Sequence, residues 1–333
     1  MPENPEGVSI IICAKNEAVH LKKNLPLILG QNYPEFEVVV VNDCSVDDSA
    51  DYLYAIAAQY PRLQIRDIKQ SSKLIQGKKY PLTVGIKAAT YNKVLLTDAD
   101  CTPVSEKWIS LMMGAYTGDK EIILGYAPYE KQKGFLNKCI RFETFYSALQ
   151  YLSFAKAGLP YMGVGRNLSY KKKIFFDNNV FVKRPELFSG DDDLFINAVA
   201  RGSNTTLQLA KESFMVSEPK TSWEGWANQK QRHLSTARHY RGIHKFLLAL
   251  LPTMHIIFYL FLVLTLMYSH YWQYAISLLL ARWVIEGLVF FSAMRRLNEK
   301  DIFSFFPLFD LLLLVYYIRF ASPALVNKTS KWK

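Results

Sequence analysis

The chain has 333 residues, of which 50% are hydrophobic, 14% are aromatic and only 4 are cysteines. Its 40 Lys and Arg residues exceed its 29 Asp and Glu residues, which gives a formal net charge of +11. The aromatic content excludes an intrinsically disordered chain, and the low cysteine count excludes a disulfide-rich scaffold. A globular protein, a membrane protein or a combination of the two remains.

Three short apolar runs in the N-terminal part of the chain predict buried parallel strands. They are VSIIIC at residues 8–13, EVVVVN at 37–42 and KVLLT at 93–97. Segments 17–30 and 49–60 follow the first two runs and have the length of helices. Strands that are apolar along their whole length and alternate with helices are typical of an α/β domain with helices on both faces of a parallel sheet.

Acidic residues follow each of these runs. Glu17 follows the first run, Asp43 the second, and Asp98 and Asp100 the third. Open α/β sheets bind ligands at the carboxyl ends of their strands, so we expect these carboxylates to lie together. The Asp-x-Asp spacing suits a divalent cation whose other ligands are phosphate oxygens. Neither G-x-G-x-x-G nor G-x-x-x-x-G-K-[ST] follows a strand, which disfavours the usual dinucleotide site and a P-loop.

The C-terminal part contains three apolar stretches, at about 246–269, 271–294 and 303–325. The first has no Asp, Glu, Lys or Arg, and it exceeds the length of about 20 residues that crosses a bilayer. In the second, Arg282 and Glu286 are four residues apart, so we expect them to pair. The third contains charged residues and prolines, and the sequence leaves open whether it spans the membrane or re-enters it.

Basic residues flank these stretches unevenly. They gather before the first stretch (Arg232, Arg238, Arg241 and Lys245) and between the second and third (Arg295, Arg296 and Lys300). The positive-inside rule then places residues 1–245 in the cytoplasm, at the inner membrane of the cell. A spanning third stretch would put Lys328, Lys331 and Lys333 outside, against this rule, so the charges argue for re-entry while the length of the stretch argues for a span. The basic charge also predicts binding to anionic lipids of the bilayer, and no motif points to nucleic acid.

Four motifs carry a resemblance to a known family. They are VSIIICAKNE (8–17), VVVVNDCSVDDS (38–49), GKKYPLTVGI (77–86) and LLTDADC (95–101). In this order they resemble the inverting family-two glycosyltransferases of the GT-A fold. More narrowly, they look like the membrane-bound branch that includes ceramide glucosyltransferases and poly-N-acetylglucosamine, hyaluronan and cellulose synthases. The resemblance implies a Rossmann-like GT-A domain at 1–220, an interfacial helix at 221–245 and a membrane region at 246–333.

The resemblance also implies roles for residues near the strand ends. Glu17 and Asp43 would contact the base and ribose of the nucleotide, and Lys78 would lie near the nucleotide or its phosphates. Asp98 would lie near the ribose and the metal, and Asp100 would bind Mg²⁺ or Mn²⁺ directly. The cation would bridge the diphosphate of the nucleotide-sugar donor and offset the charge on the leaving group.

Two later motifs extend the implied site. The loop at 163–171, which includes Asn167, resembles the loop that lies beneath the sugar in the family. Asp191 falls where the family has its catalytic base, a carboxylate that takes the proton of the acceptor hydroxyl. Gly190 replaces a glutamate of the family at this point, so Asp192 remains an alternative base.

A motif near the first apolar stretch completes the resemblance. Residues 229–233 read Gln-Lys-Gln-Arg-His and match the Gln-x-x-Arg-Trp motif of the family except at His233. In the family this motif lies on an interfacial helix that covers the active site. Gln229 and Arg232 are therefore implied to help hold the diphosphate, and an arginine suits bidentate recognition of phosphate.

These residues predict a metal-dependent inverting glycosyltransferase. It would move a sugar from a nucleotide-sugar, expected to be a UDP-sugar, to a hydroxyl of a lipid or short-glycan acceptor at the cytoplasmic membrane face. A processive polysaccharide synthase is one alternative, which is disfavoured because such enzymes usually carry helices before the catalytic domain and this chain starts directly at its first strand. A non-catalytic, membrane-anchored subunit that binds nucleotide-sugars is another, and the complete acidic set argues against it.

Overall fold

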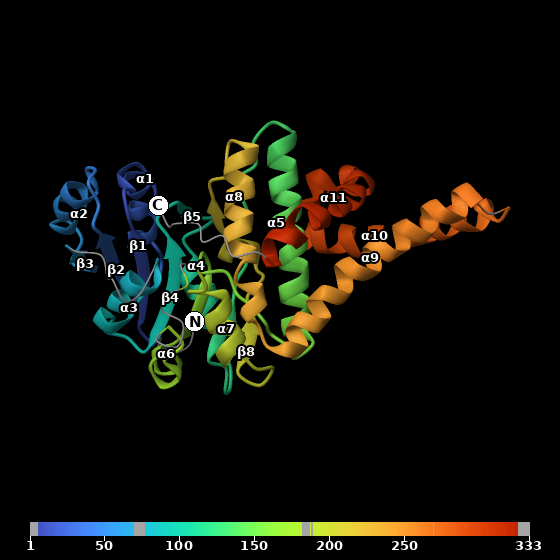
Figure 1. The fold of residues 1–333 in the computed structure, drawn as a ribbon. Coiled ribbons are helices and arrows are strands. Elements are labelled where there is room, and N and C mark those ends of the chain that lie inside the picture. The colour runs from blue at the N-terminus through green and yellow to red at the C-terminus, as the bar shows by residue number, and fades with distance from the viewer. Residues whose placement is uncertain (1–5, 70–76, 182–186, 188, 269, 326–333) are drawn as a thin grey trace.

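A sheet covered by helices precedes a long helical hairpin in the computed structural model (Figure 1). The structure describes residues 6–69, 77–181, 187, 189–268 and 270–325. The α/β class that the sequence predicts for the N-terminal part is confirmed by the alternation of strands and helices.

Seven strands of the described chain form one sheet, in the order β3-β2-β1-β4-β7-β6-β8. Their bounds are β1 Val8–Ala14, β2 Phe36–Asp43, β3 Leu63–Ile68, β4 Lys93–Asp98, β6 Ile122–Leu124, β7 Leu168–Lys171 and β8 Thr205–Leu207. The first four strands in this order are parallel, whereas β7 is antiparallel to β4 and β6. A small second sheet pairs β5 (Cys101–Pro103) with β9 (Met215–Ser217). The three apolar runs of the sequence are β1, β2 and β4, whose carboxyl ends lie side by side.

Helices bury both faces of the sheet. Alternate residues of β1 belong to two hydrophobic clusters, with Ile10 and Ile12 on one face and Ile11 on the other. On the Ile10 face lie α1 (Ala18–Leu29), α2 (Ser49–Ala57) and α4 (Trp108–Gly114). On the Ile11 face lie α3 (Lys79–Ala88), α6 (Lys172–Asn178) and α7 (Asp193–Val199). This double burial explains why the strands are apolar along their whole length.

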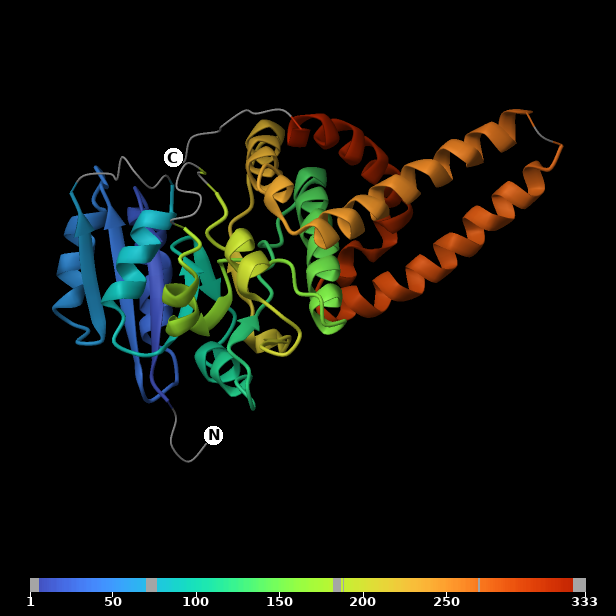
Figure 2. The same cartoon turned by 60° about the horizontal axis from the view of Figure 1, so that its bottom comes forward.

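A long helix, α5 (Phe135–Lys156), stands between the sheet and the C-terminal helices (Figures 1 and 2). Beside it lies α8 (Trp223–Leu234), which follows the short 3-10 helix η1 (Lys211–Ser213) and β9. The segment 221–245 is not one helix, because α8 ends at Leu234 and the 3-10 helix η2 (Ala237–His239) leads to a new helix at Gly242.

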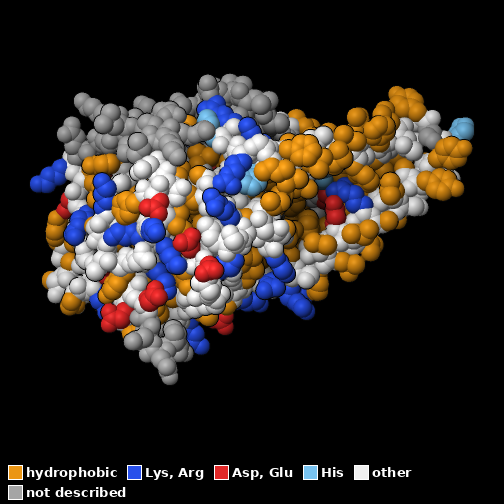
Figure 3. All heavy atoms as spheres, turned by 90° about the horizontal axis from the view of Figure 1, so that it is seen from below, with side chains coloured by type: hydrophobic (Ala, Val, Ile, Leu, Met, Phe, Trp, Pro, Cys, Tyr) orange, Lys and Arg blue, Asp and Glu red, His pale blue; other side chains and the backbone are white. Residues whose placement is uncertain are grey.

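A hairpin of two long apolar helices projects from the α/β domain (Figure 1). It consists of α9 (Gly242–Tyr268) and α10 (Trp272–Arg296), and it is followed by η3 (Lys300–Phe305) and α11 (Phe306–Leu325). Three helical segments of the described chain, 242–268, 272–296 and 300–320, are long and apolar enough to cross a membrane. Hydrophobic side chains cover the projecting hairpin (Figure 3), including Phe261 and Leu288, which are 62% and 70% exposed.

The last helix, α11, does not follow the hairpin to its tip. Near its start, the Asp310 carboxylate lies 2.9 Å from Arg282 in the middle of α10. Near its end, Phe320 packs against Trp226 of α8, with ring centroids 6.4 Å apart. The helix therefore runs from the middle of the hairpin back to the α/β domain, and Figure 2 shows it crossing the base of the hairpin.

A buried polar cluster ties the three C-terminal helices together. Asp310, which is 2% exposed, accepts hydrogen bonds from Tyr259 of α9, and from Arg282 and Trp283 of α10 at 2.9 and 3.0 Å. Arg282 also pairs with Glu286 at 2.7 Å, as their spacing predicts. Charged groups in apolar surroundings are costly unless they are paired in this way, so the cluster fixes the position of α11 against the hairpin.

One glycine allows helix α3 to lie close against the sheet. A Cβ atom on Gly85 of α3 would lie 2.6 Å from Ile11 Cγ2 and 3.1 Å from Val41 Cγ2. Gly85→Ala should therefore destabilise the protein by about 1–3 kcal/mol through overpacking. Gly114→Ala, in α4 with nothing within 4 Å of the added atom, is the matched control and should leave stability unchanged or slightly higher. Thermal unfolding of the detergent-solubilised variants measures both effects, and equal midpoints would contradict the expectation.

Candidate active site

A cleft of about 1180 Å³ opens at the carboxyl ends of β1 and β4 and continues between α5, α8 and α9. Eight of the ten site residues predicted from the sequence line it: Glu17, Lys78, Asp98, Asp100, Asp191, Asp192, Gln229 and Arg232. Asp43 and Asn167 are not among its lining residues.

The loops that follow β1 and β2 are joined to each other. The amide of Asn16 donates to Ser45 Oγ at 2.9 Å, and the amide of Val46 donates to Asn16 Oδ1 at 2.8 Å. Asn16 and Cys44 adopt positive φ angles of 55° and 53°, a conformation that asparagine tolerates better than most residues. This pairing holds the residues after both strands at one edge of the sheet.

Glu17 takes part in a small charged group at the outer end of the cleft. Its carboxylate contacts His20, whose Nε2 lies 3.3 Å from Glu218, and Lys23 pairs with Glu218 at 2.6 Å. Burial lowers the pKa of His20, but Glu17 and Glu218 outweigh burial and raise it. These residues therefore provide carboxylate acceptors, and His20 is protonated more easily than a histidine in water.

Asp43 ends β2 and is only 4% exposed. Burial raises the pKa of its carboxyl group, and Lys15 acts in the opposite direction. The structure places Asp43 at the expected edge of the sheet but beside the cleft rather than on its wall.

Lys78 connects two parts of the cleft that are distant in the sequence. Its ammonium group, at the N-terminus of α3, pairs with Asp98 at the end of β4 and lies 4.0 Å from Asp191 Oδ2. Burial lowers the pKa of Lys78, but Asp98 and Asp191 raise it well above its usual range. Burial raises the pKa of Asp98, and Lys78, Arg166 and Arg232 bring it below its usual value. Lys78 therefore stays protonated and Asp98 stays ionised.

Asp100 is the second carboxylate of the Asp-x-Asp pair. It accepts a hydrogen bond from Ser217 of β9 at 3.3 Å, and burial and the nearby Asp98 raise its pKa. In the described part of the chain, no group of three or more His, Cys, Asp and Glu side chains forms a metal site. Two carboxylates fit a hard cation that takes its remaining ligands from a bound diphosphate and water.

The three aspartates at 191–193 have different partners. Asp192 caps α7 and accepts from the amides of Gly165 and Asp193, each at 2.7 Å. Asp193 accepts from the hydroxyls of Thr236 and Tyr240. Burial and the adjacent aspartates raise the pKa of Asp192 to about 8. Asp192 and Asp193 thus hold the loop to its surroundings, and Asp191 faces Lys78.

Asn167 lies in the core and not on the cleft wall. Its side-chain amide donates to the carbonyls of Tyr126 and Ser213 at 2.9 and 2.8 Å, and its oxygen accepts from Trp108 at 3.0 Å. All its polar groups are thus satisfied inside the protein, so the implied contact of Asn167 with the nucleotide-sugar does not fit this structure. Its packing role positions the loop that contains it.

The neighbouring residue, Arg166, faces the cleft instead. Its guanidinium group lies over the Tyr129 ring at 4.5 Å, and its Nη1 atom is buried without a hydrogen-bond partner in the described chain. Arg166 also lowers the pKa of Asp98 and Asp100. The sequence offered one signal for Arg166, a basic residue directly after the second of two glycines of the loop, whereas the motif comparison pointed to the neighbouring Asn167.

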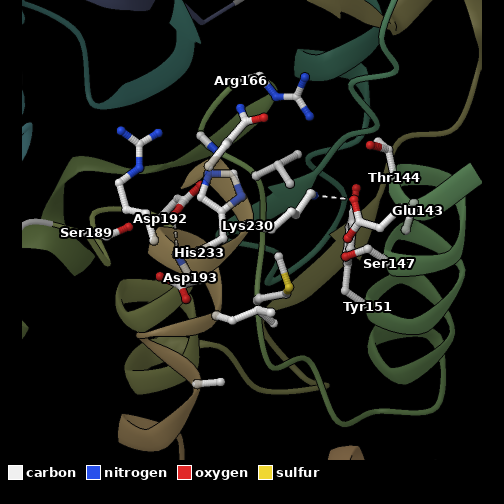
Figure 4. Close-up of a pocket in the computed structure, with 18 of the residues that line it drawn as sticks. Glu143, Thr144, Ser147, Tyr151, Arg166, Ser189, Asp192, Asp193, Lys230 and His233 are labelled. Carbon is white, nitrogen blue, oxygen red and sulfur yellow. Dashed lines mark hydrogen bonds and ion pairs between the residues drawn. The ribbon is translucent and has the colours of Figure 1, made fainter. Parts of the chain in front are cut away.

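Helix α8 forms a further part of the cleft wall. Gln229 donates to the Tyr129 hydroxyl at 3.1 Å, and Lys230 pairs with Glu143 of α5. Figure 4 shows Lys230 reaching Glu143, while His233 lies on the side of Asp192. Burial and the positive charges of Lys230 and Arg232 lower the pKa of His233 well below its usual value, so it is neutral near pH 7.

Comparison with known proteins identifies the family. Residues 9–176, about half of the chain, match the domain described as Glycosyl transferase family 2. The chain belongs to this family. As a family-two glycosyltransferase it is an enzyme that transfers sugars, which the motifs of the sequence predict.

The curated relatives of this glycosyltransferase match a short segment. The poly-beta-1,6-N-acetyl-D-glucosamine synthase of Staphylococcus epidermidis is 32% identical over 95 residues, which make up 28% of this chain and 22% of the relative. The synthase of the same name from Staphylococcus aureus strain COL is 30% identical over 95 residues, with the same shares. The chain thus covers about a fifth of the length of these relatives.

A solved structure shows the fold of this glycosyltransferase. It is the mannosyltransferase from Pyrobaculum calidifontis in complex with GDP-Man and Mn²⁺, which is 17% identical. The match covers 93% of this chain and 88% of that chain, with a TM-score of 0.56. The GT-A fold predicted from the sequence is confirmed by this likeness and by the family match.

Lys78 offers a test of the electrostatics of the site. The Lys78 pair lowers the folded-state pKa of Asp98, so its contribution to stability is present above the unfolded pKa near 4 and is lost as the pH falls. Lys78→Met should therefore destabilise the protein by about 2 kcal/mol at pH 7.5 and by less at about pH 3, because the contribution is lost as the pH falls through the lowered folded-state pKa of Asp98. Lys87→Met, on the exposed side of the same helix, is the control. Thermal unfolding at both pH values measures the difference, and a loss that does not depend on pH would argue against this pairing.

Proposed function

We propose that this enzyme transfers a sugar from a UDP-sugar to a hydroxyl of a lipid or short-glycan acceptor, with inversion at the anomeric carbon. One observation carries the proposal: the ammonium group of Lys78 contacts both Asp98 and Asp191. The carboxylates suited to the donor and the carboxylate suited to the acceptor therefore face one cleft. The curated relatives are named as synthases of an N-acetylglucosamine polymer, which supports an N-acetylhexosamine or hexose as the sugar.

The donor half of the proposed site lies at the strand ends. Glu17 and Asp43 lie at the edge where the base and ribose would bind. Arg232 matches the family motif, and two further cations of the cleft, Arg166 and Lys78, would also face the diphosphate. Arginine and lysine bind phosphate oxygens through charge-assisted hydrogen bonds.

A divalent cation belongs to this half. Asp100, with Asp98 beside it, would hold Mg²⁺ or Mn²⁺ together with the diphosphate, and a cation there offsets the negative charge of the departing nucleotide. The mannosyltransferase of the same fold was solved with Mn²⁺, which supports the choice of metals.

Asp191 is proposed as the base. Its carboxylate takes the proton of the acceptor hydroxyl as the hydroxyl oxygen forms a bond to the anomeric carbon. The bond from that carbon to the diphosphate oxygen breaks at the same time, and UDP leaves with the electron pair. Asp192 accepts hydrogen bonds from two backbone amides, so it positions the loop. The Asp191 carboxylate faces Lys78 instead.

The enzyme is proposed to work at the cytoplasmic face of the inner membrane. Helices α9 and α10 would span the bilayer, and α11 would return along its surface, because its far end contacts α8. This topology keeps the basic residues before α9 and after α10 on one side, where anionic lipids attract them. The lysines at 328, 331 and 333 lie outside the described residues.

A processive polysaccharide synthase is the second candidate, and the names of the curated relatives favour it. The two candidates differ in product size. Labelled UDP-sugars, incubated with the enzyme and a membrane lipid extract, should give a product that carries one or a few sugars. A ladder or a long polymer would replace the first candidate with the second.

A donor screen tests the core of the proposal. Release of nucleoside diphosphate is measured for UDP- and GDP-sugars, with lipid extract and Mn²⁺ present or absent. We expect turnover with one UDP-sugar, an increase with the extract, and loss of turnover on chelation of the metal. Turnover restricted to a GDP-sugar would contradict the donor assignment, and binding of UDP-sugars without any turnover would support a non-catalytic subunit.

Substitution of the two candidate bases separates their roles. Asp191→Asn should lower kcat about 10²–10⁴-fold, the usual contribution of general-base catalysis, with the affinity for UDP unchanged. Asp192→Asn should cost less, because it weakens the anchoring of the loop but leaves the base. Asp177→Asn, on the exposed side of α6, is the control. If the Asp192 variant loses more kcat than the Asp191 variant, the assignment must be reversed.

The pH dependence of kcat is an independent test of which aspartate is the base. The pKa of Asp192 is raised to about 8, so about a tenth of it would be ionised at pH 7 and nine-tenths at pH 9. With Asp192 as the base, kcat would rise about tenfold between these values. The absence of this rise would argue against Asp192 as the base. Steady-state rates at saturating donor, measured at several pH values, distinguish the two.

A further inference from the structure

One face of α5 lines the cleft on the side opposite the aspartate loop. Glu143, Thr144, Ser147 and Tyr151 lie on this face, because residues three, four, seven or eight apart share one side of a helix. Figure 4 shows them across the cleft from Asp192. The motifs that suggest donor binding include none of these four residues.

Two polar groups of this region are buried without partners. The Thr144 hydroxyl has no hydrogen-bond partner in the described chain, and its residue is 9% exposed. The side-chain oxygen of Gln229, on α8, is likewise buried and unpaired. Buried polar atoms in folded proteins are nearly always satisfied. Both residues line the cleft, where a bound polar molecule would offer these atoms a hydrogen-bond partner.

The ion pair of Lys230 and Glu143 adds charge to the same region. Glu143 Oε1 also accepts from the hydroxyl of Tyr316 on α11, at 3.3 Å. Helices α5, α8 and α11 therefore meet at this glutamate. A hydroxyl-bearing group between them would find carboxylate, ammonium and hydroxyl partners within one small volume.

The cleft becomes apolar where it reaches the hairpin. Its lining there comes from α9 and α11 and consists mainly of Leu248, Ala249, Pro252, Ile256, Leu313 and Phe320. Two tyrosines in this wall, Tyr316 and Tyr317, direct their hydroxyls to Glu143 and Tyr146 of α5 and leave their rings to the cavity. A polysaccharide leaving by this route would lose its hydrogen bonds to water, whereas a hydrocarbon chain would not.

We propose that the acceptor is a membrane lipid with a hydroxyl-bearing head group, bound with its head against the polar face of α5 and its tail between α9 and α11. The proposal rests on the proposed function for its chemistry: the lipid hydroxyl gives its proton to Asp191 and receives the sugar, and the nucleotide leaves. The proposal narrows the acceptor to a lipid. The lining of the cleft changes from carboxylates to hydroxyl groups and then to hydrocarbon side chains in the direction of the proposed bilayer.

Two bulky substitutions test the route. Ser147→Trp would fill the polar part and Ala249→Trp the apolar part of the cleft. Ser153→Trp and Leu250→Trp, on exposed positions of the same helices and away from the lining, are matched controls. The assay uses the labelled UDP-sugar found by the donor screen, and measures label in the lipid phase against the concentration of membrane lipid extract. We expect at least a tenfold rise in the half-saturating concentration for the first two variants only, with the affinity for UDP unchanged in all four.

A milder substitution provides a second test that does not depend on the folding of the bulky variants. Thr144→Val keeps the shape of the side chain and removes only the unpaired hydroxyl. It should raise the half-saturating lipid concentration about fivefold, the effect of one hydrogen bond, with kcat nearly unchanged. A hydroxyl with a purely structural role would change the thermal midpoint and not this concentration.

The outcomes separate this inference from the proposed function. Wild-type lipid labelling in Ser147→Trp, Ala249→Trp and Thr144→Val would overturn the lipid route while the enzyme activity stands. Turnover that yields only water-soluble product would do the same. Absence of nucleotide release from every sugar nucleotide would reject the proposed function itself.

Discussion

The ammonium group of Lys78 is the interaction on which the cleft depends. Asp98 ends a strand and Asp191 belongs to a loop before α7, so nothing in the local backbone brings them together. Two carboxylates that face one cavity repel each other unless a cation lies between them. Lys78 pairs with the first and approaches the second to 4.0 Å. The lysine therefore lets the carboxylate at the sheet edge and the carboxylate of the loop face a single cleft.

The sequence predicted the parts of the fold that follow from simple patterns. The strands β1, β2 and β4 are continuous apolar runs, and their acidic ends lie together as expected because parallel strands share one edge. Strands such as β6 (Ile122–Leu124) and β8 (Thr205–Leu207) have only three residues, too few to show a period. Eight of the ten predicted site residues line the cleft.

The parts of the site that were missed depend on which way a side chain points. Asn167 and Arg166 are neighbours in one loop, yet the amide is fully bonded in the core and the guanidinium faces the cleft. A sequence motif shows which residue types occur at which positions, but it does not show which way their side chains point. The polar face of α5 was missed for another reason: Glu143 and Thr144, which line the cleft, lie among aromatic residues that mask the helical pattern.

The path of α11 limits where the chain could be shortened without loss of the cleft. This helix supplies one wall of the cleft, and it packs on α5 and α8 through Tyr317 and Phe320. Helix α9 supplies another part of the same wall. A shortened protein that ends before α9 would thus lose part of its cavity and expose Trp226, which is now 9% exposed, to water. The hairpin and α11 are more than an anchor for an independent catalytic unit, because the active cavity is complete only when the apolar part of the chain is present.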